Sequence, residues 1–206
     1  MMFLYLFLLF VPAWTAVLPQ KVVSTESVVL RTETPDDYRL SDIEWRGFPD
    51  FDGVVFKGTI QNVIHQMKKI KGVDYTPDFV SKAENQTLGV QPAAIDCDQE
   101  IKCGGPKAKP KPVSEGVDYL LQLSDTIMCS NGPTACGRIS CSWDAAIIWC
   151  NDKAAPSNSF KCKMFAGYAD AILGHCSVQK PDPLVSGKNT DYDLLLSVIV
   201  EKQACD

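Results

Sequence analysis

The alternation of apolar and polar positions is clearest between residues 136 and 152, where the chain reads CGRISCSWDAAIIWCND. Period-two alternation predicts a strand over Gly137–Trp143. The apolar positions on one face of this strand are Ile139, Cys141 and Trp143. The next segment, Ala146–Cys150, is apolar at every position, which is typical of a strand covered on both faces or central in its sheet. With Asp144 and Ala145 as the turn, the pattern predicts a central β-hairpin.

Upstream of the hairpin, the pattern predicts a short strand followed by an amphipathic helix. The strand is expected at Val54–Lys57. Thr59 is a favourable N-cap for the helix, and Gly72 is a favourable stop. Apolar residues recur at helical spacing at Ile60, Val63, Ile64, Met67 and Ile70. A second short helix is indicated where Thr76 precedes Pro77.

The cysteine-containing part of the chain also alternates between strand and helix patterns. Leu88–Cys97 ends in an apolar run and predicts a first strand, whereas residues 103–113 are rich in Gly, Pro and Lys and predict a loop. Ser114 is expected to cap the next helix. Residues 164–173 form one apolar helix face that Gly174 ends.

A Pro- and Gly-containing loop over residues 180–189 leads to a last strand, where residues 192–200 alternate. The order is therefore strand, helix, strand, strand, helix, strand. Such an order predicts an α+β fold in which a four-stranded antiparallel sheet carries both helices on one face, as in ferredoxin-like folds.

The first 16 residues, MMFLYLFLLFVPAWTA, are apolar and carry no charged side chain. They are too short to span a bilayer, which takes ~20 residues, and they indicate a secretory signal peptide. The alternative is a buried N-terminal helix. Residues 17–87 lack cysteine and are expected to form a leader or pro-region followed by a small subdomain. Residues 88–206 hold every cysteine and are expected to form a separable, disulfide-stapled domain.

The nine cysteines fall into two groups on the predicted topology. The first group, near one end of the sheet, is Cys97, Cys103 and Cys176. The second group, near the other end, is Cys129, Cys136, Cys150, Cys162 and Cys205. Cys141 lies in mid-strand without a partner, so it is the candidate free thiol. Because nine is odd, the protein is expected to be a monomer or a dimer joined through the odd cysteine.

The net charge of −5 carries no basic excess, so a nucleic-acid partner is not expected. No segment after the signal peptide has the length and apolarity of a transmembrane helix. The sequence therefore predicts a secreted, extracellular protein. Asn85 begins an Asn-Gln-Thr sequon in the polar join between the two parts and is a candidate glycosylation site.

Four motifs carry a family resemblance: CGG at 103–105, EGVDYL at 115–120, NGP at 131–133 and the hairpin at 136–152. Over roughly residues 88–205 the chain resembles small secreted cysteine-rich fungal proteins and, more distantly, the necrosis-inducing effectors of plant-pathogenic fungi. Those effectors share an α/β-sandwich with virally encoded killer toxins. The resemblance implies virulence or toxin activity against a host or competitor cell, through a protein, cell-wall or membrane component. It supplies no catalytic residue.

Candidate chemistry in the sequence is sparse. His65 lies on the amphipathic helix, and His175 adjoins Cys176, where a disulfide is favoured over a Cys-His nucleophile. The cysteine spacing lacks the close pairs of structural zinc sites, so no metal, cofactor or catalytic residue is predicted. Asp144 and Asp152 flank the second hairpin strand and form the one candidate carboxylate pair. The alternative to a binding protein is a small secreted hydrolase such as a ribonuclease.

Trp143 and Trp149 are the candidate binding residues. Both belong to the predicted hairpin, one on each strand. We expect one tryptophan to pack under the helices and the other to face outward, where a large aromatic side chain is a favourable interface anchor. The alternative is that both tryptophans are core residues.

Overall fold

The computed structural model describes residues 38–80, 99–155, 159–178 and 181–205. These residues belong to one compact unit, Arg31–Asp206. Several predicted features lie outside the described residues: the signal peptide over 1–16, the sequon at Asn85, and the first strand over 88–97 with Cys97. Among the described helices, none is both long enough and apolar enough to cross a membrane.

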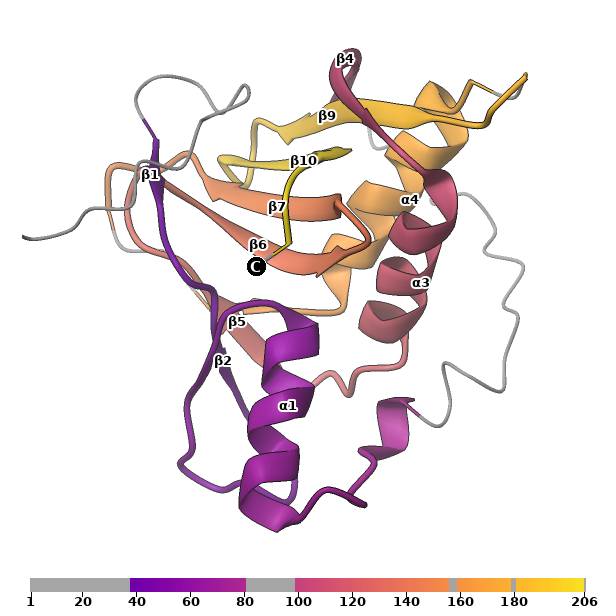
Figure 1. The fold of residues 1–206 in the computed structure, drawn as a ribbon. Coiled ribbons are helices and arrows are strands. Elements are labelled where there is room, and N and C mark those ends of the chain that lie inside the picture. The colour runs from indigo at the N-terminus through magenta and orange to yellow at the C-terminus, as the bar shows by residue number, and fades with distance from the viewer. Residues whose placement is uncertain (1–37, 81–98, 156–158, 179–180, 206) are drawn as a thin grey trace, which may run out of the picture. The chain divides into compact units, whose positions relative to one another are not determined.

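The fold is α+β and is built on two sheets (Figure 1). The larger sheet has six strands in the order β1-β6-β7-β10-β9-β4. Its strands are β1 (Arg39–Leu40), β4 (Gln99–Ala108), β6 (Ala135–Ser142), β7 (Ala145–Asn151), β9 (Val185–Asp191) and β10 (Leu196–Lys202). The smaller sheet has four strands in the order β3-β2-β5-β8. Its strands are β2 (Glu44–Arg46), β3 (Phe56–Lys57), β5 (Met128–Ser130) and β8 (Phe160–Lys161).

Helices α3 (Pro110–Leu121) and α4 (Met164–Cys176) pack against each other and cover one face of the six-stranded sheet (Figure 1). Helix α1 (Ile60–Lys71) packs against β3 and β6. Thr59 caps α1 as predicted, because its hydroxyl accepts a hydrogen bond from the backbone N–H of Asn62 at 3.2 Å. Helix α4 also matches its apolar pattern, although it continues two residues beyond Gly174.

The predicted four-stranded sheet with two helices is wrong in its strand count, because the sheet that carries the helices has six strands. Residues 180–189 were expected to be a loop, yet β9 begins at Val185 and pairs with both β10 and β4. The last strand consequently begins at Leu196, and residues 192–195 form the turn before it. Asp191 stabilises this turn, since its Oδ1 accepts a hydrogen bond from the N–H of Leu194 at 2.8 Å.

The predicted loop over residues 103–113 is also ordered. Its first half belongs to β4, which contains an irregularity between Cys103 and Ala108. Its second half opens α3, which begins at Pro110 rather than after Ser114. Proline is favourable in the first helical turn, since its missing N–H would have no partner there. Pro110 therefore begins this helix, although the Gly, Pro and Lys content of residues 103–113 predicted a loop.

The central hairpin forms as expected, with β7 buried along its whole length in the middle of the large sheet. Its turn lies one residue earlier than predicted, at Trp143 and Asp144, because Ser142 pairs with Ala145. A bulge between Arg138 and Ser140 adds one residue to β6. The extra residue breaks the simple alternation, so Ile139 joins the core under the helices while Cys141 joins the cluster on the opposite face.

The described part of the predicted N-terminal segment is built into the same fold. Strand β1 pairs with β6, and β2 pairs with β5. Trp45 is fully buried in the main core. A Cβ atom at Gly137 would lie 2.5 Å from Ile43 Cδ1, which shows how closely this segment packs on the hairpin. The boundary predicted at residue 87 therefore does not divide the described fold.

Eight cysteines form four disulfides: Cys103–Cys176, Cys129–Cys162, Cys136–Cys150 and Cys141–Cys205. Three of the bridges pair cysteines within the predicted groups, but the grouping is wrong for Cys205. This residue lies with Cys141 near the tip of the hairpin, whereas Cys136 and Cys150 lie toward its other end. The prediction that Cys141 is the free thiol is wrong, because the bulge turns Cys141 toward Cys205 in the C-terminal tail. The ninth cysteine, Cys97, lies outside the described residues. Four disulfides are typical of proteins that mature in an oxidising compartment.

Candidate functional site

The tip of the β6–β7 hairpin presents a large aromatic side chain to solvent. Trp143 is 82% exposed. Trp143 and Asp144 have positive φ angles of 51° and 57°, the conformation that a two-residue hairpin turn of type I′ requires. Asn and Gly are the favoured residues there, and a bulky L-residue in the left-handed region is disfavoured by roughly 1–2 kcal/mol. The turn is thus strained by a tryptophan that gains no burial from being there.

The tip is held from two sides. Gln61, in the first turn of α1, donates from Nε2 to Ser140 Oγ at 2.9 Å and accepts at Oε1 from the Cys141 N–H at 3.1 Å. The C-terminal tail is joined to the same strand by Cys141–Cys205, and the Gln203 N–H donates to the Asp144 carbonyl at 3.0 Å. Such bracing orders the turn before any partner arrives. The sequence pattern missed Gln61, because its bonding partners are about 80 residues away along the chain.

Trp149 occupies the opposite environment and is not available for binding. It is fully buried beneath the helices. Its ring centroid lies 4.5 Å from that of Phe165 and 5.7 Å from that of Phe160. Of the two candidate binding residues, the structure therefore leaves Trp143 exposed and places Trp149 in the core.

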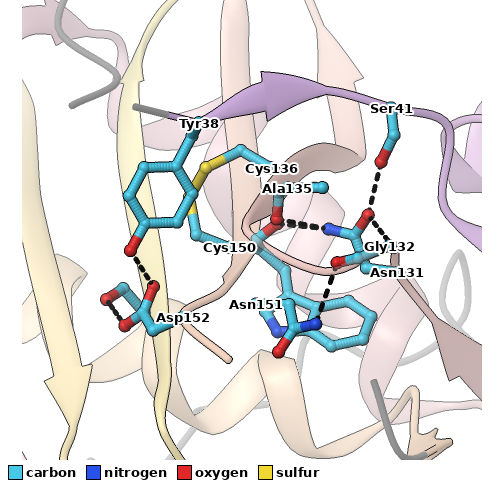
Figure 2. The surroundings of a disulfide bond; sticks show 11 residues. Tyr38, Ser41, Asn131, Gly132, Ala135, Cys136, Cys150, Asn151 and Asp152 are labelled. Carbon is cyan, nitrogen blue, oxygen red and sulfur yellow. Dashed lines mark hydrogen bonds between the residues drawn. A yellow bond between two sulfur atoms is a disulfide. The ribbon is translucent and has the colours of Figure 1, made fainter. Parts of the chain in front are cut away.

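A buried asparagine fixes the far end of the hairpin (Figure 2). Asn131 Nδ2 donates to the carbonyls of Ala135 and Trp149, at 2.9 and 3.1 Å. Its Oδ1 accepts from the Gly132 N–H at 2.9 Å and from the Ser41 hydroxyl. One side chain thus joins the N-terminal segment to both hairpin strands, which indicates a structural role.

The candidate carboxylate pair does not converge. Asp144 is at the hairpin tip, whereas Asp152 follows the other end of β7. Eight residue steps along an extended chain separate them by ~26 Å. Asp152 is instead satisfied locally by hydroxyl groups, since Tyr38 Oη donates to it at 2.6 Å and Ser197 Oγ at 2.7 Å (Figure 2).

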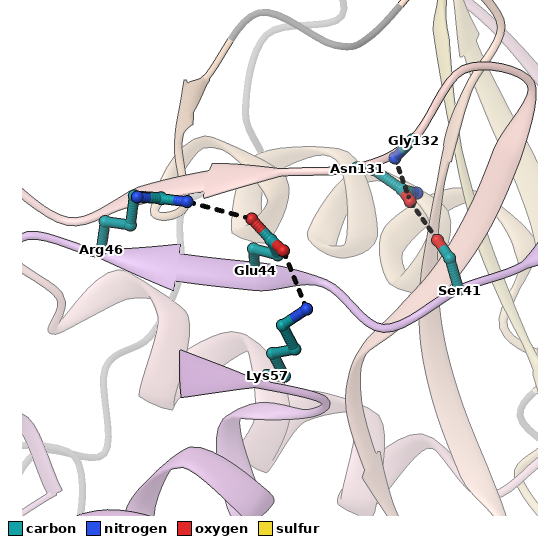
Figure 3. Close-up of polar contacts among 6 residues, drawn as sticks. All are labelled: Ser41, Glu44, Arg46, Lys57, Asn131 and Gly132. Carbon is teal, nitrogen blue, oxygen red and sulfur yellow. Dashed lines mark hydrogen bonds and ion pairs between the residues drawn. The ribbon is translucent and has the colours of Figure 1, made fainter. Parts of the chain in front are cut away.

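A polar groove of about 790 Å³ lies beside the smaller sheet, near Asn131 (Figure 3). Within it, Glu44 contacts Lys57 Nζ at 3.0 Å and Arg46 Nη2 at 3.2 Å. Hydrogen bonds from Lys57 and then Arg46 lower the pKa of the Glu44 carboxyl. An ionised carboxylate with both neighbours cationic is an acceptor at neutral pH and not a general acid.

The two histidines do not contribute to either site. His65 is exposed on α1, and His175 is exposed in the last turn of α4. The neighbour of His175, Cys176, is in a disulfide, as the sequence favoured. Among the described residues no group of three His, Cys, Asp or Glu side chains is arranged to hold a metal ion.

Comparison with protein-family models gave no match. Comparisons with curated proteins and with solved structures gave no match either.

Proposed function

We propose that this protein is a secreted effector- or toxin-like binding protein whose contact surface is centred on Trp143. The observation that carries the proposal is an exposed tryptophan at a strained, braced hairpin tip. Backbone strain that folding does not require is often kept for function. The partner class is a host or competitor protein, cell-wall component or membrane component, acted on outside the producing fungal cell.

The physical advantage of this arrangement lies in preorganisation. Large aromatic side chains dominate the free energy of protein interfaces. Ordering a flexible loop on binding opposes association, and a turn already fixed by Gln61 and Cys141–Cys205 avoids most of that loss. The bracing at the tip is therefore the property that a binding anchor needs.

Secretion is part of the same proposal. Four disulfides favour an oxidising compartment, and the resemblance to small secreted fungal proteins is consistent with it. In this proposal the signal peptide over residues 1–16 is removed, and Asn85 carries a glycan. Mass spectrometry of the secreted protein tests both.

The alternative is a small secreted hydrolase such as a ribonuclease, with the polar groove as its site. The groove brings Glu44, Arg46 and Lys57 together, which is the observation in its favour. A Glu44→Gln variant assayed on RNA distinguishes this alternative: hydrolysis by the wild type that the variant loses would favour the hydrolase.

The direct test compares Trp143→Ala with Tyr192→Ala, using oxidised, secreted protein. Tyr192 is 57% exposed in the turn at the opposite end of the sheet, so it controls for loss of an exposed aromatic ring. We expect Trp143→Ala to be secreted normally and to weaken target-cell binding and killing by roughly thirtyfold, as for a hot-spot residue of ~2 kcal/mol. Equal target-cell binding and killing by the wild type and Trp143→Ala would contradict the proposal.

A further inference from the structure

A second concave site lies at the base of the N-terminal region, away from the hairpin tip. It is a cavity of about 270 Å³ between the loop after β2, the loop after α1 and the segment after α3. Its lining includes Phe48, Phe51, Tyr75 and Phe79. Pockets for drug-sized ligands measure roughly 300–1,000 Å³, so this cavity fits a smaller group.

The aromatic rings of this pocket are inclined to one another. The Phe51 and Tyr75 centroids are 5.9 Å apart with an interplanar angle of 79°. The Phe48 and Phe79 centroids are 6.0 Å apart, at 37°. Rings that meet at such angles can turn a π face and a ring edge toward the same small group, and π faces attract cations.

The charges on the lining have one sign. Asp50 and Asp78 are its charged residues, and both are exposed. Tyr75 Oη donates to Asp50 Oδ2 at 3.1 Å. Burial raises the pKa of Tyr75, and the negative charges of Asp50 and Asp78 raise it further. The two carboxylates on the lining therefore favour a positive charge at this pocket.

A cation already contacts one of the lining rings, although its residue is not part of the lining. The Lys71 ammonium is 5.4 Å from the centroid of Phe51, one of the lining rings. Lys71 is an exposed residue at the end of α1, so its side chain has room to move aside. The Phe51 ring thus already has an ammonium group as a neighbour, which is the kind of contact that a π face favours.

We propose that this aromatic pocket binds the alkylammonium group of a small organic cation. Asp50 and Asp78 supply the countercharge, and the nearby positive charge of Lys71 opposes binding. The proposal does not depend on Trp143. A quaternary ammonium group suits the site, since it is weakly hydrated, apolar on its surface and positively charged. A neutral group of the same shape would fill the cavity but would gain nothing from the two carboxylates.

The test is a titration of the full-length oxidised protein, followed by NMR on the aromatic resonances of Phe51 and Tyr75. The probes are choline and its neutral isostere 3,3-dimethylbutan-1-ol. We expect choline to shift these resonances in a saturable way and the isostere to bind about tenfold more weakly or not at all. Equal binding of the two probes, or no saturable shift with choline, would overturn the proposal.

Variants near the pocket are expected to change the affinity for choline in opposite directions. Asp50→Asn/Asp78→Asn should weaken choline binding about tenfold, because both countercharges are lost, whereas Lys71→Gln should strengthen it about two- to fivefold. Asp193→Asn, an exposed acid in the β9–β10 turn, is the matched control and should change nothing. Asp50 and Asp78 are both exposed, so their substitution leaves the core intact. Unchanged affinity in the double Asp variant, or weaker binding in Lys71→Gln, would also overturn the proposal.

Discussion

Trp143 and Trp149 are six residues apart in one hairpin, yet they occupy opposite environments. Trp149 is fully buried between the sheet and the helices, whereas Trp143 is 82% exposed. The strand around Trp149 is stabilised by burial and by ring contacts with Phe160 and Phe165. The turn at Trp143 is held by bonds and a disulfide that approach it from other elements. Residue type alone therefore does not determine the role of a tryptophan in this hairpin. Its position relative to the turn determines whether it is buried or exposed.

The largest effect is expected from the buried member of the pair. Trp149→Ala should lower the free energy of unfolding by ~3–5 kcal/mol, because it leaves a cavity beside Phe165. Secretion of this variant should fail. Trp149→Phe is the matched control: it keeps a ring and removes an indole N–H that has no hydrogen-bond partner among the described residues. Chemical denaturation and secretion yield measure both. A stable, secreted Trp149→Ala variant would contradict the assignment of Trp149 to the core.

The next effect concerns the disulfide beneath the tip. Cys141→Ser/Cys205→Ser should lower the free energy of unfolding by ~2–4 kcal/mol, because this bridge closes a long loop of the unfolded chain. The bridge spans 64 residues, against 14 for Cys136–Cys150. Loss of the shorter bridge should therefore be less destabilising, by about 1 kcal/mol. Thermal unfolding of both double variants checks the order, and the reverse order would disagree with this loop-length explanation.

A smaller loss is expected from the helix that supports the tip. Gln61→Ala removes two hydrogen bonds to β6 and should lower the free energy of unfolding by ~1–2 kcal/mol. Amide hydrogen exchange at residues 141–145 should accelerate at the same time. Gln66→Ala, on the same helix, is the control because the Gln66 amide donates to the nearby carbonyls of Lys57 and Asn62 and not to β6 among the described residues. If both variants exchange alike at the tip, Gln61 does not brace it.

The smallest expected effect is a gain in stability, in contrast to the losses above. Trp143→Asn replaces a strained residue with one that favours the first position of a type I′ turn. We expect the melting temperature to rise slightly, with a gain of less than ~1 kcal/mol, while target binding falls. Calorimetry and a binding assay on the same preparation separate the two effects. A drop in stability would mean that Trp143 contributes to the fold after all.

The sequence by itself determined the elements whose signals are local. Thr59 and the apolar spacing after it gave α1, and the apolar face after Met164 gave α4. The unbroken apolar run gave β7 as a central strand. Caps and periodicity act within a turn or two of the chain, so they can be read without knowledge of distant residues.

Only the tertiary structure decided the features that depend on distant partners. Val185–Asp191 is a strand because β10 and β4 pair with it on both sides, although its own residues suggested a loop. A single bulge in β6 reversed the direction of Cys141 and gave it Cys205 as a partner, 64 residues away. Alternation carries no mark of an inserted residue, so one such insertion changes the face of every position after it.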